Sequence, residues 1–194
     1  RPRTPPGAQG QPGDSEKGVR EGRLKLGYLD EVGFSLALPP TYTWSKRGRL
    51  HRLRVPTRWG SQGRLNAIGT LWFAQQKVLS YRLLPGSVTS EEVISCLDEV
   101  ALSCSPQSLT VVVLDNAGCH TSKLVQEKRS AWEEQGLFLR FLPPYCPFLN
   151  LIEGVWKRLK AFLLPRRCYA SVADLGQAVV MALKLLTAEE VQSH

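Results

Sequence analysis

The spacing of the apolar residues changes near residue 88 of this 194-residue chain. Before that point, alternating and β-leaning segments predict strands, and their close succession favours an antiparallel meander. After that point, helical spacing is interrupted by two further apolar segments. One of them, Leu109–Asp115, is a continuous, largely β-branched run, which is typical of a strand buried on both faces. The predicted strands are 24–30, 32–38, 65–74, 77–84, 109–115 and 137–142.

Four helices are predicted in the second part of the chain, and most of them begin at capping residues or end at a proline. The first helix follows Thr89, which forms a capping box with Glu92, and the second spans 121–135. The third runs from the cap Asn150 to Pro165, and the fourth follows Ser171, which forms a capping box with Asp174. A meander is thus followed by the order α-β-α-β-α-α. The sequence therefore predicts an α/β fold with a mixed central sheet, antiparallel meander first and parallel strands after it, flanked by helices.

The first residues differ in composition from the rest. Residues 1–20 contain four prolines and four glycines and almost no large apolar side chains. Such a segment buries too little apolar surface to order itself. We expect a disordered tail or linker over 1–22 and one folded domain over 23–194, a length that suits a single core. Because the chain begins with Arg1 rather than Met, we expect it to be part of a longer protein.

The charge balance narrows the class of partner. The chain has 25 Lys and Arg against 17 Asp and Glu, a net charge of +8, which favours a polyanion, nucleic acid before membrane. No apolar run approaches the roughly 18 residues of a membrane span, so no membrane partner is expected. Five cysteines without a C-x-x-C pair and three scattered histidines argue against a zinc site or a disulfide framework, and favour a reducing compartment.

The positive charge is concentrated in one segment. Between Val32 and Ser90 there is no Asp or Glu, whereas a generic surface mixes both signs. We predict phosphate contacts from the basic residues of 46–64, with a merely solvated basic face as the alternative. Trp44 and Trp59 either stack on bases or pack inside a hairpin. The predicted DNA-binding residues of this segment are Lys46, Arg47, Arg49, Arg52, Arg54, Arg58 and Arg64.

Three acidic residues stand at comparable places in the predicted elements. Asp30 ends the first predicted strand, Asp115 ends the most buried one, and Glu153 lies in the first turn of a helix that follows another strand. Ligands of α/β sheets gather at the carboxyl ends of strands, so we expect the three carboxylates to converge at one edge. Carboxylates without a histidine or cysteine cage are the donor set that Mg²⁺ prefers.

Each acid also has a plain structural interpretation. Asp30 would be a solvated strand end, and Asp115 would turn the chain at Asp-Asn-Ala-Gly through side-chain hydrogen bonds. Glu153 would cap its helix and pair with Lys157 one turn later. These interpretations need no metal and no substrate.

Several motifs resemble the catalytic domain of mariner-like DDE transposases, and above all that of their bacterial insertion-sequence relatives. The family patterns are Leu-Asp-Asn-Ala-x-x-His and Leu-Pro-Pro-Tyr-Ser-Pro-x-Leu-Asn-Pro-Ile-Glu, and the likeness covers roughly residues 24–165. Cys146 replaces the usual Ser, Phe148 a polar or acidic residue, and Leu151 the usual Pro, but no carboxylate is lost. The matching stretches are Asp30-Glu31, Tyr42-Thr-Trp44 followed by Arg47-Gly48, Leu114–Ala117 with His120, and Leu142–Lys160.

The resemblance implies an RNase H-like fold with Asp30, Asp115 and Glu153 as catalytic, metal-binding residues. Their chemistry would be two-metal phosphoryl transfer with Mg²⁺, for which Mn²⁺ may substitute: one ion activates water or a 3′-hydroxyl and the other stabilises the leaving oxygen. For His120 a purely structural hydrogen bond is the alternative. Supporting roles fall to Glu31, Asn116, His120 and Asn150, and phosphate contacts to Lys157 and Lys160.

The implied function is metal-dependent DNA strand cleavage and strand transfer, with transposon ends and target DNA as partners and a homodimer as the expected assembly. Without the family's N-terminal helix-turn-helix region, this chain should bind DNA with little sequence preference. We expect it in the nucleus of a eukaryote, or otherwise in the cytoplasm or nucleoid. Two alternatives stay open: a domesticated remnant that binds DNA or protein without cutting, and another RNase H-like nuclease such as an RNase H or a junction resolvase.

Overall fold

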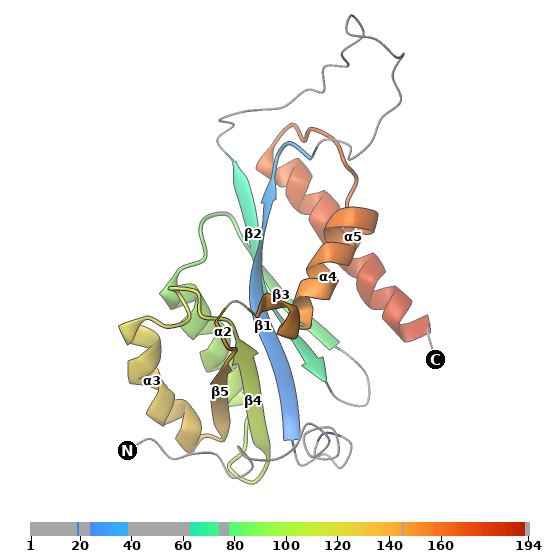
Figure 1. Cartoon of the computed structure of the whole chain (residues 1–194). Coiled ribbons are helices and arrows are strands. Elements are labelled where there is room, and N and C mark those ends of the chain that lie inside the picture. Colours follow the sequence, from blue (N-terminus) through green and yellow to red (C-terminus); the bar gives the residue numbers. More distant parts are fainter. Residues whose placement is uncertain (1–18, 20–23, 39–62, 74–77, 145, 193–194) are drawn as a thin grey trace, which may run out of the picture.

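A five-stranded sheet organises the part of the chain that the computed structural model describes, which is residues 19, 24–38, 63–73, 78–144 and 146–192 (Figure 1). The strand order is β3-β2-β1-β4-β5. The first three strands pair antiparallel, and β4 and β5 run parallel to β1. This confirms the mixed sheet, and the arrangement is RNase H-like. The strands are β1 Leu24–Ser35, β2 Arg64–Phe73, β3 Val78–Leu84, β4 Leu109–Leu114 and β5 Leu137–Phe141.

Helices cover both faces of the sheet (Figure 1). Helices α2 and α3 lie on one face, and α4 and α5 lie on the other. The caps Thr89 and Ser171 accept backbone N–H groups of their first turns, as predicted, and Ser122 does the same for α3. The helical elements are α2 Ser90–Leu102, α3 Lys123–Glu134, the 3₁₀ turn η1 Pro147–Leu149, α4 Ile152–Arg158, the π-helical turn η2 Leu159–Leu163 and α5 Val172–Gln192.

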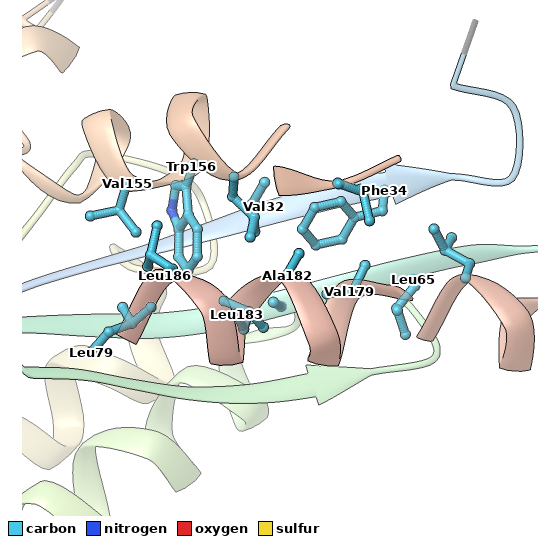
Figure 2. Close-up of a cluster of buried hydrophobic side chains, with 14 of the residues drawn as sticks. Val32, Phe34, Leu65, Leu79, Val155, Trp156, Val179, Ala182, Leu183 and Leu186 are labelled. Carbon is cyan, nitrogen blue, oxygen red and sulfur yellow. The ribbon is translucent and has the colours of Figure 1, made fainter. Parts of the chain in front are cut away.

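The alternation of side chains along β1 divides the apolar residues into two cores. Val32 and Phe34 point towards α4 and α5, where Figure 2 shows Phe34 against Val179 and Ala182 of α5. Leu29 belongs to the other core, with side chains of α2 and α3. Because successive strand residues face opposite sides, neighbouring residues of β1 contribute to different sides of the molecule.

One predicted break in the sheet is absent. The sequence predicts two strands separated at Asp30-Glu31, but β1 runs without interruption from Leu24 to Ser35. Its pairing with β2 is continuous from Leu26–Phe73 to Ser35–Arg64. The ladder is made by backbone groups, so two polar side chains on opposite faces do not interrupt it. Asp30 therefore lies inside a strand and not at its end.

The start of α4 also differs from the prediction. Leu151 occupies the N-cap position and makes no capping bond with its side chain. Asn150 instead donates from Nδ2 to the carbonyl oxygen of Leu29, 3.2 Å away. The predicted single helix changes at Leu159 into a π-helical turn, which the N–H of Leu164 closes by donating to the Leu159 carbonyl. Pro165 then follows the helical segment, as predicted.

Three predicted regions lie outside the described residues: nearly all of the tail over 1–22, the connection between the predicted strands 65–74 and 77–84, and the basic segment before Gly63 with Trp44 and Trp59. Among the helices that the structure describes, none is both long and apolar enough to cross a bilayer.

A glycine sets how closely α4 approaches the sheet. Gly69 of β2 is the register partner of Asp30 and lies under the ring of Trp156. A Cβ atom at Gly69 would stand 2.8 Å from Cη2 of Trp156 and 3.1 Å from the carbonyl oxygen of Ser80. The missing side chain therefore makes room for the buried indole of α4.

We expect Gly69→Ala to lower the free energy of unfolding by about 1–3 kcal/mol, because the added methyl overpacks a filled site. Gly176→Ala is the matched control. Its Cβ would meet only Leu65 Cδ2 at 3.8 Å, and alanine favours a helix interior, so this variant should be as stable as the wild type or more stable. Urea denaturation measures both. Equal stability of the Gly69→Ala variant and the wild type contradicts the packing argument.

Candidate metal centre

The pairing of β1 with β4 brings two of the predicted acids to one level. The parallel register aligns Tyr28 with Val113. Asp30 and Asp115 each come two residues later along the chain, and neighbouring strands lie about 4.8 Å apart. Asp115 directly follows β4, which ends at Leu114. The carboxyl end of β4 therefore stands beside the middle of β1.

Helix α4 brings the third acid to the same place. The bond from Asn150 to the Leu29 carbonyl ties the start of the helix to the residue before Asp30. Glu153 lies in the first turn, and its N–H donates to the Asn150 carbonyl at 3.1 Å. Trp156, three residues on, packs over Gly69 opposite Asp30. Glu153 and Trp156 share one side of the helix, so both contacts orient the acid towards β1.

The environment of Asp30 is unfavourable for a negative charge. The residue is 8% exposed. Burial raises the pKa of its carboxyl to about 7, and the charges of Glu31, Glu153 and Asp115 add to this, while a hydrogen bond from the Glu31 backbone opposes it. A nearby cation is the usual compensation for such a site.

Asp115 is held differently, by the buried ring of His120. Nδ1 of His120 lies 2.6 Å from Oδ1 of Asp115, and its Nε2 lies 3.1 Å from Oε2 of Glu31. The second contact is an ion pair by distance, but its angle is not that of a hydrogen bond. The hydrogen bond from His120 lowers the pKa of Asp115. Burial lowers the pKa of His120, but its contacts with the two carboxylates outweigh this and raise the pKa to about 9, which favours the doubly protonated ring at neutral pH.

Glu31, Cys119 and His120 form a compact group that sequence reasoning did not find. Among the described residues, their ligand atoms all lie within 4.8 Å of one another, whereas Asp30, Asp115 and Glu153 form no group that tight, as expected of carboxylates that repel each other. Cys119 donates to Glu31 at 3.6 Å, and burial with the Glu31 charge raises the pKa of this thiol to about 11. A protonated thiol and an imidazolium are poor metal ligands.

The two predicted supporting asparagines bind backbone. Asn116 donates from Nδ2 to the carbonyl of Leu142 at 2.6 Å and so joins the end of β4 to the segment after β5. Asn150 is buried and joins the loop before α4 to β1. Both side chains hold in place the segments that carry Asp115 and Glu153.

Lys160, one of the predicted DNA-binding residues, lies close enough to Glu153 and Asp30 for their charges to affect its pKa. The pKa of Lys160 is lowered, mainly by burial and further by the charge of Arg64, while the charges of Glu153 and Asp30 oppose this shift. Lys160 follows Glu153 by about two helical turns, so both residues lie on the same side of the helical segment. Arg64, at the start of β2, and Lys157, on α4, are exposed. The others, Lys46, Arg47, Arg49, Arg52, Arg54 and Arg58, lie outside the described residues.

A family model and several solved structures are similar to this chain. Residues 25–176 match the family model described as DDE superfamily endonuclease. The Mos1 transposase paired-end complex with left transposon end is similar over 91% of this chain and 51% of that chain, with 17% identity and a TM-score of 0.58. The Mos1 mariner paired end complex with Mn is similar over 91% and 56%, with 16% identity and a TM-score of 0.53. These likenesses concern the fold, and the chain spans about half the length of both. No curated protein matches it.

The raised pKa of Asp30 predicts a pH-dependent stability. Between its ordinary value of 3.8 and about 7, the folded state holds a proton that the unfolded state has lost. The free energy of unfolding therefore falls as pH rises through this window. Asp30→Asn should be more stable than the wild type by about 2–4 kcal/mol near pH 8 and about equal near pH 4. Urea denaturation with a chelator measures this, and parallel pH profiles of the two proteins contradict it.

Proposed function

The chain belongs to the DDE superfamily endonucleases, and from this we propose that it cuts and joins DNA strands by metal-dependent phosphoryl transfer, with Asp30, Asp115 and Glu153 as its catalytic and metal-binding residues. The observation that supports the proposal is that the charges of Asp115 and Glu153 both act on the buried carboxyl of Asp30. The register of β1 and β4 puts Asp30 and Asp115 at one level, and the charge of Glu153 reaches Asp30. A purely structural role would give three acids from three distant segments no reason to lie near one another, because their charges repel.

The residues fit a hard divalent cation. All three side chains offer carboxylate oxygens, the ligands of Mg²⁺ and Mn²⁺. Asp30 is buried among negative charges, and a cation would stabilise its ionised form. When bound, two Mg²⁺ ions, or Mn²⁺ in their place, would supply Lewis-acid stabilisation of the attacking and leaving oxygens. The protein's own part is to hold the three carboxylates from β1, from the end of β4 and from α4.

We assign binding of the DNA phosphates to the basic residues beside these acids. Lys160 and Arg64 share a neighbourhood with Asp30 and Glu153, and Lys157 is exposed on α4. We include the basic segment from Lys46 to Arg58 in the same surface. The proposed substrates are transposon ends and target DNA, bound by a homodimer. The likeness to paired-end complexes of Mos1 transposase supports this extension.

A second candidate function is a domesticated transposase remnant that binds DNA or protein without cutting. It is favoured by Phe148 and Leu151, which are 72% and 46% exposed in the loop and turn before Glu153. An exposed apolar side chain suits a protein partner better than it suits phosphate. The three converging acids favour catalysis, because a module that only binds has no need of them.

The catalytic proposal predicts nicking of supercoiled DNA in Mg²⁺ or Mn²⁺ that Asp115→Ala and Asp30→Asn reduce to background. Each change removes a carboxylate ligand, so calorimetry should also show weaker Mn²⁺ binding. Glu99→Gln removes an exposed carboxylate that is paired with Arg82, and it should leave both measurements as in the wild type. Equal nicking by the wild type and the Asp115→Ala variant contradicts the proposal. Mn²⁺ affinity no higher than that of a triple-alanine variant at the acids favours the remnant.

The DNA surface predicts a change in salt dependence. Removing one phosphate contact lowers the slope of log affinity against log salt by about 1. We expect this for Lys160→Ala in fluorescence anisotropy titrations between about 50 and about 200 mM salt. Lys128→Ala removes the same charge from α3, where the lysine pairs with Asp98, and should leave the slope unchanged. The same slope for Lys160→Ala and the wild type removes Lys160 from the DNA surface.

A further inference from the structure

We propose that Glu31 is a positioning residue that fixes the carboxylate of Asp115 for metal binding, acting through the ring of His120. This rests on the proposed function, because it concerns the same metal centre. Glu31 belongs to β1, whereas His120 and Asp115 belong to the segment after β4. The contact therefore joins β1 to the segment after β4, in addition to the backbone pairing of β1 with β4 itself.

The position of Glu31 on β1 separates it from the metal ligands. Asp30 and Glu31 are neighbours, so their side chains point to opposite faces of the sheet. Asp30 shares its face with Val32 and Phe34, under α4 and α5, and Glu31 shares its face with Leu29, towards α2 and α3. Glu31 therefore reaches the centre only by way of another residue.

His120 is that residue, and it is fixed at two ends. The side chain is 0% exposed, its Nδ1 lies 2.6 Å from Asp115 Oδ1, and its Nε2 lies 3.1 Å from Glu31 Oε2. One anchor would leave the ring plane free to turn about the other contact. The hydrogen bond with Asp115 on one side of the ring and the close contact with Glu31 on the other limit the orientation of the ring, and with it the position of the Asp115 oxygen.

The hydrogen bonds of Asp115 leave one oxygen for a cation. Among the described residues, the bonds to this side chain fall on Oδ1, which accepts from the backbone N–H of Ala117 at 2.9 Å and faces His120. Oδ2 has no such partner in the part of the chain that the structure describes. The carboxylate is therefore held by one oxygen and presents the other, as metal-binding carboxylates held by outer residues do.

The two carboxylate oxygens of Glu31 have separate partners. Oε2 faces His120, and Oε1 accepts from the thiol of Cys119 at 3.6 Å. Cys119 and His120 are consecutive, so both contacts bring the same short stretch of the β4–α3 loop to β1. Cys119→Ser keeps a donor for this contact and removes the sulfur ligand, so it separates the contact from metal binding by the thiol.

The test is a double-mutant cycle on Mn²⁺ affinity, measured by calorimetry on the full chain. Glu31→Gln keeps the size of the side chain and removes its charge, and we expect Mn²⁺ binding about tenfold weaker. His120→Asn should have a similar effect. The double variant should be no weaker than the weaker single variant, because residues that act as one unit are not additive. Glu133→Gln removes a carboxylate paired with Arg129 on α3 and should stay within about twofold of the wild type.

Each outcome decides the matter. No Mn²⁺ binding by the wild type overturns the proposed function, and the inference with it. Binding by the wild type with unchanged affinity of Glu31→Gln overturns the inference alone, as does a double variant in which the two losses multiply. If thermal melting shows that His120→Asn does not fold, the single comparison of Glu31→Gln with Glu133→Gln decides.

A cation held by Glu31, Cys119 and His120 themselves is the remaining alternative. Zn²⁺ is its probe, because thiol and imidazole ligands suit that ion. Zn²⁺ binding by the wild type that both Glu31→Gln and Cys119→Ser abolish overturns the positioning role and makes this group a metal site of its own. Zn²⁺ binding that neither change affects supports the positioning role.

Discussion

The hydrogen-bonded register between β1 and β4 is the constraint on which the candidate centre depends. Its last pair is Tyr28 with Val113, and Asp30 and Asp115 each come two residues after that pair, so the backbone register sets the two acids at one level. A slip of one residue would turn every side chain of one strand to the wrong face. The two apolar cores prevent this slip, since it would expose Val32 and Phe34 on one side and bury polar groups in their place.

The centre is costly for the fold, and the surrounding packing offsets that cost. Asp30 is buried beside other carboxylates, which disfavours its charged form. Asp115 is treated in the opposite way, because His120 lowers its pKa. Two acids at one level are thus given different environments, one buried among like charges and the other half-exposed and hydrogen-bonded. The strands and α4 hold both arrangements against repulsion because each packs on an extensive apolar cluster.

Sequence patterns predicted the elements that are determined by the types and spacing of their own side chains. Alternation and helical spacing identified the sheet and its flanking helices, and the caps Thr89 and Ser171 were found from their residue types. Sequence patterns failed where backbone pairing or a residue distant in sequence determines the local structure. The continuity of β1 through Asp30 depends on β2, and Asn150 suits a cap and a tether equally well by chemistry. The contact of Glu31 with His120 joins residues far apart in sequence, so no local pattern records it.

The bond from Asn150 to the Leu29 carbonyl has an evolutionary consequence. The acceptor is a backbone atom, which every residue at position 29 would offer, and the donor is a single buried side chain. The residues on either side of Asn150 are exposed and contribute nothing to this attachment. Substitutions of the exposed residues Phe148 and Leu151 would therefore leave this attachment, and with it the place of Glu153 beside β1, intact. The outer surface of the loop and the position of the acid can change independently, although both belong to the same few residues of the chain.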